Sequence, residues 1–240
     1  MHKLPEGLES LNMKCERFQS RLKQHYHLPD GLIPLNMDCR RFNAYLYELS
    51  ASIKSLHLKG LETLSITSDR FNRQLHNLPA GFKILDIACD RFNAPLPNLP
   101  ARLETLAIRS ARFSGQLPNL PAGLKVLDIA CDRFNAPLPN LPARLKTLAI
   151  RSARFSGQLP NLPAGLKVLD IACDRFNAPL PDLPAGLETF KFESNHFTQV
   201  LPHFPIGLGT LHIISHNLAR PPPAIPTSVH TVFIVWNTEV

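Results

Sequence analysis

The sequence predicts a solenoid of stacked repeats, mostly β, in which extended segments rather than helices return the chain from each strand to the next. Residues 141–182 repeat residues 99–140 with two changes, Glu104 against Lys146 and Asn140 against Asp182. Each copy contains a finer unit of 21 residues, LPxxLxxLxIxxxRFxxxLPx, and most of the 23 prolines fall in register with it. A fixed period of this length indicates repeats that bury their apolar sides against one another.

The repeats extend over the whole chain, so we expect a single domain at residues 1–240. The first repeat has 24 residues, residues 49–56 form an additional segment after the second, and the last repeat stops after 16 residues. Counted from the leading Leu-Pro, the repeats begin at Leu4, Leu28, His57, Leu78, Leu99, Leu120, Leu141, Leu162, Leu183, Phe204 and Ile225. These are about ten repeats and a partial last one. Residues 49–56 are the one place where we expect a helical turn.

Each repeat predicts one strand. Positions 8 and 10 are apolar and position 9 is polar or small, as in Leu127, Asp128 and Ile129. This alternation is typical of a strand, so we expect parallel strands centred on positions 8–10, for example 106–108 and 127–129, in one sheet. Position 5 is also apolar, position 15 is almost always Phe, and positions 1 and 19 are usually Leu. About six apolar side chains per repeat therefore point to one side.

The segment opposite the strand is rich in proline. Ten prolines occupy position 2 and seven occupy position 20. Because proline lacks an N–H group and disfavours helix in the residue before it, the return segment LPNLP is expected to be extended and polyproline-like.

The pattern LxxLxIxx(N)xF with flanking LPxLP resembles leucine-rich repeats, in particular the short type of the YopM-like and IpaH-like bacterial effectors. The phrases RFNAPL and FNRQL also resemble the FNIP repeats of amoebae and giant viruses. The resemblance covers nearly the whole chain. It implies an α/β-class but mostly β, right-handed leucine-rich-repeat horseshoe, with a parallel sheet on the concave side and extended segments on the convex side. It also implies a protein-binding role.

The chain departs from this family in two respects. The family's asparagine at position 13, whose amide bridges adjacent turns, is matched only by Asn195 and Asn237, whereas the other repeats have mainly Asp or Ala. An Asp side chain accepts hydrogen bonds but does not donate them, and an Ala side chain does neither. An IpaH-like enzyme would also need a large catalytic domain after the repeats, whereas the repeats here continue to the end of the 240 residues. We therefore expect no enzymatic activity. The alternative is that the chain is the repeat portion of an effector enzyme.

The cysteines share one position of the repeat, position 12: Cys15, Cys39, Cys89, Cys131 and Cys173. Strands of a sheet are roughly 4.8 Å apart, so cysteines on alternate turns lie about 10 Å apart, too far for a disulfide or a shared metal ion. Only Cys15 and Cys39 are one turn apart. We interpret these residues as small, half-buried side chains that alternate with serines, and five unpaired thiols favour a reducing compartment.

The histidines do not predict a metal site either. His196, His203 and His216, together with His212, fall at different positions of the repeat and hence on different sides of the coil. No phosphate loop, HExxH motif or Ser-His-Asp order occurs. We expect no metal and no cofactor.

Position 14 is Arg in eight successive repeats, at Arg17, Arg41, Arg70, Arg91, Arg112, Arg133, Arg154 and Arg175. Stacking would place them in a column, and the net charge of +7 permits anionic partners. Binding of a polyanion or nucleic acid is therefore an alternative function. An Asp precedes four of these arginines, and no aromatic side chain is interleaved for base stacking. A solvated face is our preferred interpretation, and nucleic acid is not the expected partner.

Charged residues also alternate on the expected concave face. Asp86, Asp128 and Asp170 at position 9 alternate with Arg109 and Arg151 at position 11. Diagonal neighbours on adjacent strands can pair, so we expect a lattice of internal ion pairs rather than a substrate site.

The last repeats differ from the others. Residues 229–236, VHTVFIVW, form the most apolar strand of the chain, with Phe233 and Val235 at concave positions and Trp236 beside them. His212 and Ile214 precede them in the tenth repeat. Aromatic anchors often dominate interface energies, so these five residues are our candidate binding site, at the concave face and C-terminal edge. The alternative is an imperfect capping strand.

Together these features predict a non-catalytic protein-binding module, such as a bacterial effector or host-interaction protein, whose partner is a protein of unknown identity. The apolar strand at residues 229–236 could be buried either by this partner or by self-association of the chain through its C-terminal edge. No run of 18 apolar residues occurs, and the N-terminus has no apolar signal-peptide core. We therefore expect no membrane segment, and a protein that is cytoplasmic or exported without a cleaved signal peptide.

Overall fold

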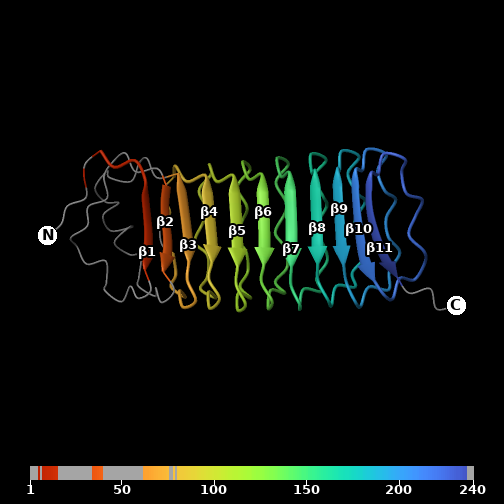
Figure 1. The fold of residues 1–240 in the computed structure, drawn as a ribbon, viewed down its shortest axis with the longest axis horizontal. Coiled ribbons are helices and arrows are strands. Elements are labelled where there is room, and N and C mark those ends of the chain that lie inside the picture. Colours follow the sequence, from red (N-terminus) through yellow and green to blue (C-terminus); the bar gives the residue numbers. More distant parts are fainter. Residues whose placement is uncertain are drawn as a thin grey trace.

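The computed structural model describes residues 5, 7–15, 34–39, 62–75, 78 and 80–236, and within them the chain forms one parallel sheet of eleven strands in sequential order (Figure 1). The strands are β1 Leu11–Cys15, β2 Pro34–Cys39, β3 Thr63–Thr67, β4 Ile84–Ala88, β5 Thr105–Arg109, β6 Val126–Ala130, β7 Thr147–Arg151, β8 Val168–Ala172, β9 Thr189–Glu193, β10 Thr210–Ser215 and β11 Thr231–Trp236. No helix occurs in these described ranges. The predicted β-solenoid is confirmed, and residues 49–56 lie outside the described residues.

The pairing register follows the repeat. Thr105 pairs with Val126 and Leu106 with Leu127, and equal repeat positions pair in the same way from β3 to β11. All the strands include the predicted positions 8–10; β2 to β11 extend beyond them at both ends, whereas β1 begins at position 8. Because the register does not slip, side chains of one repeat position form straight rows across the sheet.

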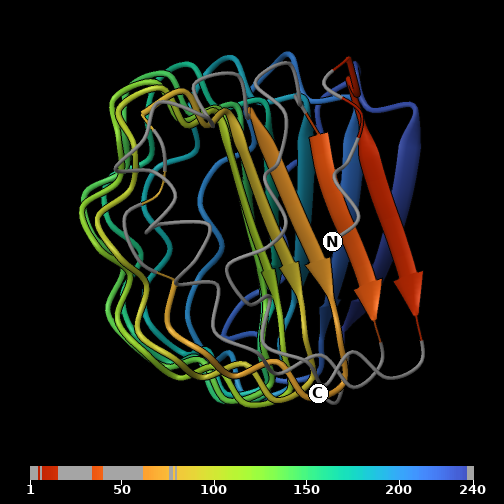
Figure 2. The ribbon, with the colours of Figure 1, turned by 90° about the vertical axis from the view of Figure 1, so that its left-hand side faces the viewer.

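The sheet forms the concave side of the molecule. Seen along the long axis, β1 and β11 lie to the right of the central green strands, and the return segments lie on the opposite side (Figure 2). These return segments are extended, and a tight turn follows each of them directly before the next strand. In that turn the backbone N–H of Leu103 donates to the carbonyl of Pro100, at 3.0 Å, and Leu124 donates to Pro121 in the next repeat. The prolines at position 2 therefore accept the hydrogen bond that closes the turn.

The core lies between the sheet and the return segments. The apolar residues at positions 5, 8 and 10 are fully buried in the middle repeats, for example Leu124, Leu127 and Ile129. The phenylalanines at position 15 form a continuous stack in which neighbouring ring centroids are 5.8–6.2 Å apart and planes are inclined by 15° or less. The stack consists of Phe71, Phe92, Phe113, Phe134, Phe155, Phe176 and Phe197. It fixes the spacing of successive turns away from the sheet.

Position 12 is buried in every repeat from Ser68 to Ser215, so the half-buried environment that the sequence suggested for it is wrong there, and the side chains of Cys15 and Cys39 lie outside the described part of the chain. Cys89, Cys131 and Cys173 are at most 1% exposed and have free thiols. Cys131 Sγ donates to the carbonyl of Ile108 on the preceding turn, at 3.3 Å. Burial raises the pKa of each of the three thiols to about 12. Position 12 is inward-facing because it continues the period-two alternation of the buried positions 8 and 10, as the burial pattern of β10 shows.

Polar side chains at two other positions replace the family's asparagine. Ser110 Oγ, at position 12, donates to the carbonyl of Phe92 on the preceding turn, at 2.8 Å. Asn93 Oδ1, at position 16, accepts from the backbone N–H of Ser114 on the following turn, at 2.9 Å. Equivalent bonds recur along the stack, for example from Ser152 to Phe134 and from Ser156 to Asn135. Bridging between turns is thus retained without an asparagine at position 13.

Candidate binding surface

The charged residues of the concave face form the predicted ion-pair lattice. Arg109 Nη1 lies 2.9 Å from Asp86 Oδ1, and its Nη2 lies 3.0 Å from Asp128 Oδ2. Arg151 spans the next pair of strands in the same way, 3.2 Å from Asp128 Oδ1 and 2.5 Å from Asp170 Oδ2. Positions 9 and 11 share one face of the sheet, so each guanidinium reaches a carboxylate on either side. Each of these five charged side chains has at least one partner of opposite charge within the lattice.

The lattice ends at Asp170 on β8, and after β9 mainly apolar side chains occupy these positions. On β10 and β11 the concave positions hold His212, Ile214, Phe233 and Val235, which we call the concave patch. The His212 ring stacks on the Phe233 ring, with centroids 4.9 Å apart. His212 Nε2 also lies 3.0 Å from Glu193 Oε1 on β9, but the two groups are not aligned for a hydrogen bond. The imidazole is therefore held between a carboxylate and a phenyl ring.

The concave patch contains four of the five residues that the sequence predicted as a binding site, all except Trp236. Ile214 pairs with Val235 in the register of β10 and β11, and both side chains are half-buried. Phe233 is 50% exposed, so its ring is available to a partner. Small and charged side chains occupy the corresponding positions of the central strands, which have no aromatic residue there.

Trp236 belongs to a different row. It pairs with Ser215, which is completely buried, and therefore lies at an inward-facing position together with Val232 and Ile234. In the described part of the chain β11 pairs only with β10. No further turn covers them among the described residues, and Val232 is 56% and Trp236 is 36% exposed. Trp236 is thus part of the open edge of the sheet rather than of the concave patch.

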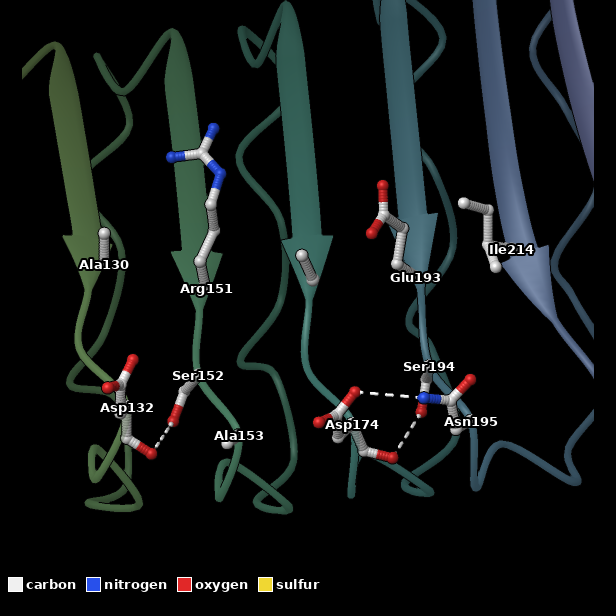
Figure 3. A pocket seen from close by; sticks show the side chains of 11 residues that line it. Ala130, Asp132, Arg151, Ser152, Ala153, Asp174, Glu193, Ser194, Asn195 and Ile214 are labelled. Atoms are coloured by element: carbon white, nitrogen blue, oxygen red, sulfur yellow. Dashed lines mark hydrogen bonds between the residues drawn. The ribbon is translucent and has the colours of Figure 1, made fainter. Parts of the chain in front are cut away.

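A groove of about 360 Å³ crosses the carboxyl ends of β6 to β10 and continues to the concave patch through Ile214 (Figure 3). It is lined by Ala130, Asp132, Arg151, Ser152, Ala153, Ala172, Asp174, Glu193, Ser194, Asn195 and Ile214. The sequence analysis missed this groove. The sequence feature that could have predicted it is the alternation of small and long side chains at position 11. This alternation leaves Ala172 between Arg151 and Glu193 on the adjacent strands.

The groove is acidic. Asp132, Asp174 and Glu193 line it, whereas its one guanidinium, that of Arg151, is already held by two lattice aspartates. Asp174 Oδ1 accepts a hydrogen bond from Asn195 Nδ2 at 3.1 Å, and the figure shows the two side chains together on the lower wall (Figure 3). Within the described ranges neither Asp132 nor Asp174 forms an ion pair.

The arginines of position 14 are exposed. The described members of this row, which we call the arginine column, are Arg70, Arg91, Arg112, Arg133, Arg154 and Arg175. Unlike Arg109 and Arg151, none of them forms an ion pair with another described residue. The described residues also include no group of three or more His, Cys, Asp or Glu side chains that could hold a metal ion. No helix of the described part is long and apolar enough to cross a bilayer.

Neither a protein-family model nor a curated protein matches the chain. The solved structures that are similar to the chain include YopM and CroV588. YopM from Yersinia enterocolitica WA-314 has a TM-score of 0.68 and 24% sequence identity, over 98% of this chain and 52% of YopM. CroV588, a circular leucine-rich-repeat protein, has a TM-score of 0.57 and 21% identity, over 87% of this chain and 34% of CroV588. The chain thus spans about half the length of the first protein and a third of the second.

Proposed function

We propose that this chain, which has the leucine-rich-repeat fold, is a non-catalytic module that binds another protein through the concave patch. The observation that carries the proposal is the change along the concave face. From β4 to β8 the polar side chains are engaged with one another, whereas on β10 and β11 an aromatic ring is half-exposed among apolar neighbours. A partner gains most where apolar surface is still in contact with water.

The rigidity of the scaffold supports the same proposal. The stacked rings and the hydrogen bonds between turns hold the concave positions in a fixed register. The His212 ring packs against Phe233 and limits its motion. An anchor that is already ordered loses less conformational entropy on binding.

The resemblance of the repeats to bacterial effectors and the similarity to YopM support a role as an effector or host-interaction protein. The chain corresponds to about half of YopM, so this role is proposed for the repeats alone. A second copy of the chain is an alternative partner, because among the described residues β11 pairs only with β10, and Val232 and Trp236 on this strand are exposed.

The test of the proposal is a quantitative pull-down with the full chain and two variants. Phe233→Ser removes the exposed ring of the concave patch, and Lys191→Ser changes an exposed side chain at the same repeat position on β9. We expect Phe233→Ser to weaken capture of a specific protein by roughly thirtyfold, as is typical of an aromatic anchor, while Lys191→Ser retains it. Equal capture by both variants and the unchanged chain would contradict the proposal.

One observation favours a second candidate function, the binding of a polyanion. The arginine column runs along one edge of the solenoid, and its charges are not neutralised by ion pairs among the described residues. Heparin is a suitable probe. Replacing Arg112, Arg133 and Arg154 by Ala is compared with replacing Lys125, Lys146 and Lys167 by Ala, which removes equal charge from position 6. If the column binds polyanions, the arginine variant elutes from heparin at lower salt than the lysine variant. Elution of both variants at the same salt concentration would show that the arginine column is not a specific binding site for polyanions.

A further inference from the structure

We propose that the groove receives a Lys or Arg side chain of the partner protein, while an apolar side chain about three residues away in the partner lies on the concave patch. This inference rests on the proposed function and names the chemistry of the partner segment. It starts from the continuity of the two surfaces, because Ile214 lines the groove and also belongs to the concave patch.

The shape of the groove comes from side-chain length along one row. Ala172 is paired on one side with Arg151 and on the other with Glu193, so a methyl group lies between two long side chains. Ala130 repeats this on the far side of Arg151. Ala153, at position 13, leaves room between Asp132 and Asp174 on the turns before and after it. The resulting volume of about 360 Å³ accommodates a long, unbranched side chain.

The charge of the groove selects a cation. Asp132, Asp174 and Glu193 present carboxylates, and the Arg151 guanidinium is already bound to two other aspartates. Arg133 and Arg175 follow the two groove aspartates in sequence, but they are not among the lining residues. A guanidinium or ammonium group that enters the groove can make charge-assisted hydrogen bonds to the carboxylates nearest to it. An acidic side chain would meet three negative charges at this place.

The position of the concave patch indicates a polypeptide rather than a free amine. Glu193 on β9 and Phe233 on β11 are two strands apart across the sheet, roughly 10 Å, and two residues apart along the strand direction, roughly 7 Å, so their backbone positions are roughly 12 Å apart. Two side chains that are three residues apart in a polyproline-II-like peptide lie on the same side of it and roughly 9 Å apart, and the length of a Lys or Arg side chain covers the remaining distance, so a basic and an apolar side chain spaced by about three residues match the two sites. The expected partner segment therefore carries Lys or Arg and an aromatic or aliphatic residue in this spacing, in either order.

The test is the selection of short random peptides, displayed on phage, against the full chain. We expect the selected peptides to be enriched in Lys or Arg at about three residues from an apolar residue, and depleted in Asp and Glu. Binding of a selected peptide is then measured with the triple variant Asp132→Asn, Asp174→Asn, Glu193→Gln. Its affinity is expected to fall roughly tenfold, because each partly exposed ion pair contributes modestly.

The control is Asp90→Asn, an exposed aspartate at the same repeat position as Asp132 and Asp174 but outside the groove. It should leave the affinity unchanged. Peptides that depend on Phe233 but lack a basic residue, or that ignore the triple variant, would overturn the inference and leave the protein-binding function intact. Failure to enrich any peptide whose binding depends on Phe233 would contradict both.

Discussion

The imidazole ring of His212 stacks on the phenyl ring of Phe233, with centroids 4.9 Å apart and planes inclined by 24°. The two residues are direct partners in the parallel register of β10 and β11, and both lie at position 9 of their repeats. In the preceding repeats this position holds charged or small residues. The contact therefore lies where the concave face changes from a lattice of ion pairs to a surface with an exposed aromatic ring.

The phenylalanine stack should be the main source of stability away from the sheet. Phe134 is completely buried and lies between Phe113 and Phe155, at 6.2 and 5.8 Å. We expect Phe134→Ala to lower the free energy of unfolding by about 3–5 kcal/mol in a urea titration, since it leaves a cavity in a closely packed row. The neighbouring exposed Arg133→Ala should change it by no more than about 0.5 kcal/mol. Similar values for the two variants would show that the stack does not stabilise the fold.

The buried thiols predict a loss of stability in alkali. Burial raises the pKa of Cys89, Cys131 and Cys173 from 9.0 to about 12. A group whose pKa is higher in the folded state stabilises the fold fully below its unfolded pKa. That stabilisation is lost as the pH rises from 9.0 towards 12. Each thiol should lower the free energy of unfolding by up to about 1.4 kcal/mol per pH unit in this window.

The matched control replaces all three cysteines by serine, which occupies the same position in the alternating repeats, for example in Ser110 and Ser152. Urea titrations at several pH values should show a shallower alkaline decline for this variant, because only the other titrating groups remain. Parallel declines would mean that the thiols ionise freely in the folded protein.

The ion-pair lattice should make a small contribution that depends on salt. Asp128 contacts two arginines, whereas Asp86 contacts one. We expect Asp128→Asn to cost about twice as much as Asp86→Asn, at roughly 0.2–1 kcal/mol per lost pair. Both costs should shrink at high salt, because the guanidinium groups are nearly half-exposed. Unfolding measured at low and high salt checks this, and a large cost that salt does not affect would contradict it.

The open edge of β11 should promote self-association in the absence of another partner. Replacing both Phe233 and Trp236 by Ser is expected to lower the association constant in sedimentation equilibrium. The central repeats should keep their stability, because each repeat contacts only its neighbours. Ile206→Ser is the control, since Ile206 is 87% exposed but lies in the turn before β10. A chain that stays monomeric at all concentrations would exclude this use of the edge.

The strands and core were predictable because their signals are local and repeated. The alternation of Leu106, Ala107 and Ile108 with period two gives the strand and its buried face, and β5 contains it. The lattice followed from the same rule, since positions 9 and 11 share a face. The full burial of position 12 was not predicted, although the same alternation puts it on the inward face with positions 8 and 10, because the small Cys and Ser side chains there give a weaker hydrophobic signal than Leu and Ile.

The groove was not predicted because it arises between strands. No single repeat contains it, and only the comparison of Arg151, Ala172 and Glu193 on three adjacent strands shows the gap. The location of Trp236 was predicted only as lying beside Phe233. Its inward row follows from its pairing with Ser215, which shows that the strand alternation continues to the end of β11.

The measurement that tests the central claim most directly is site-specific photo-crosslinking from the concave face. A photoreactive phenylalanine analogue is introduced in place of Phe233 and, in a second protein, in place of Ser65, which has the same repeat position on β3. After irradiation with the partner isolated in the pull-down, we predict a covalent adduct from position 233 and none from position 65. Equal adducts from both positions, or an adduct from position 65 alone, would contradict a binding site at the concave patch.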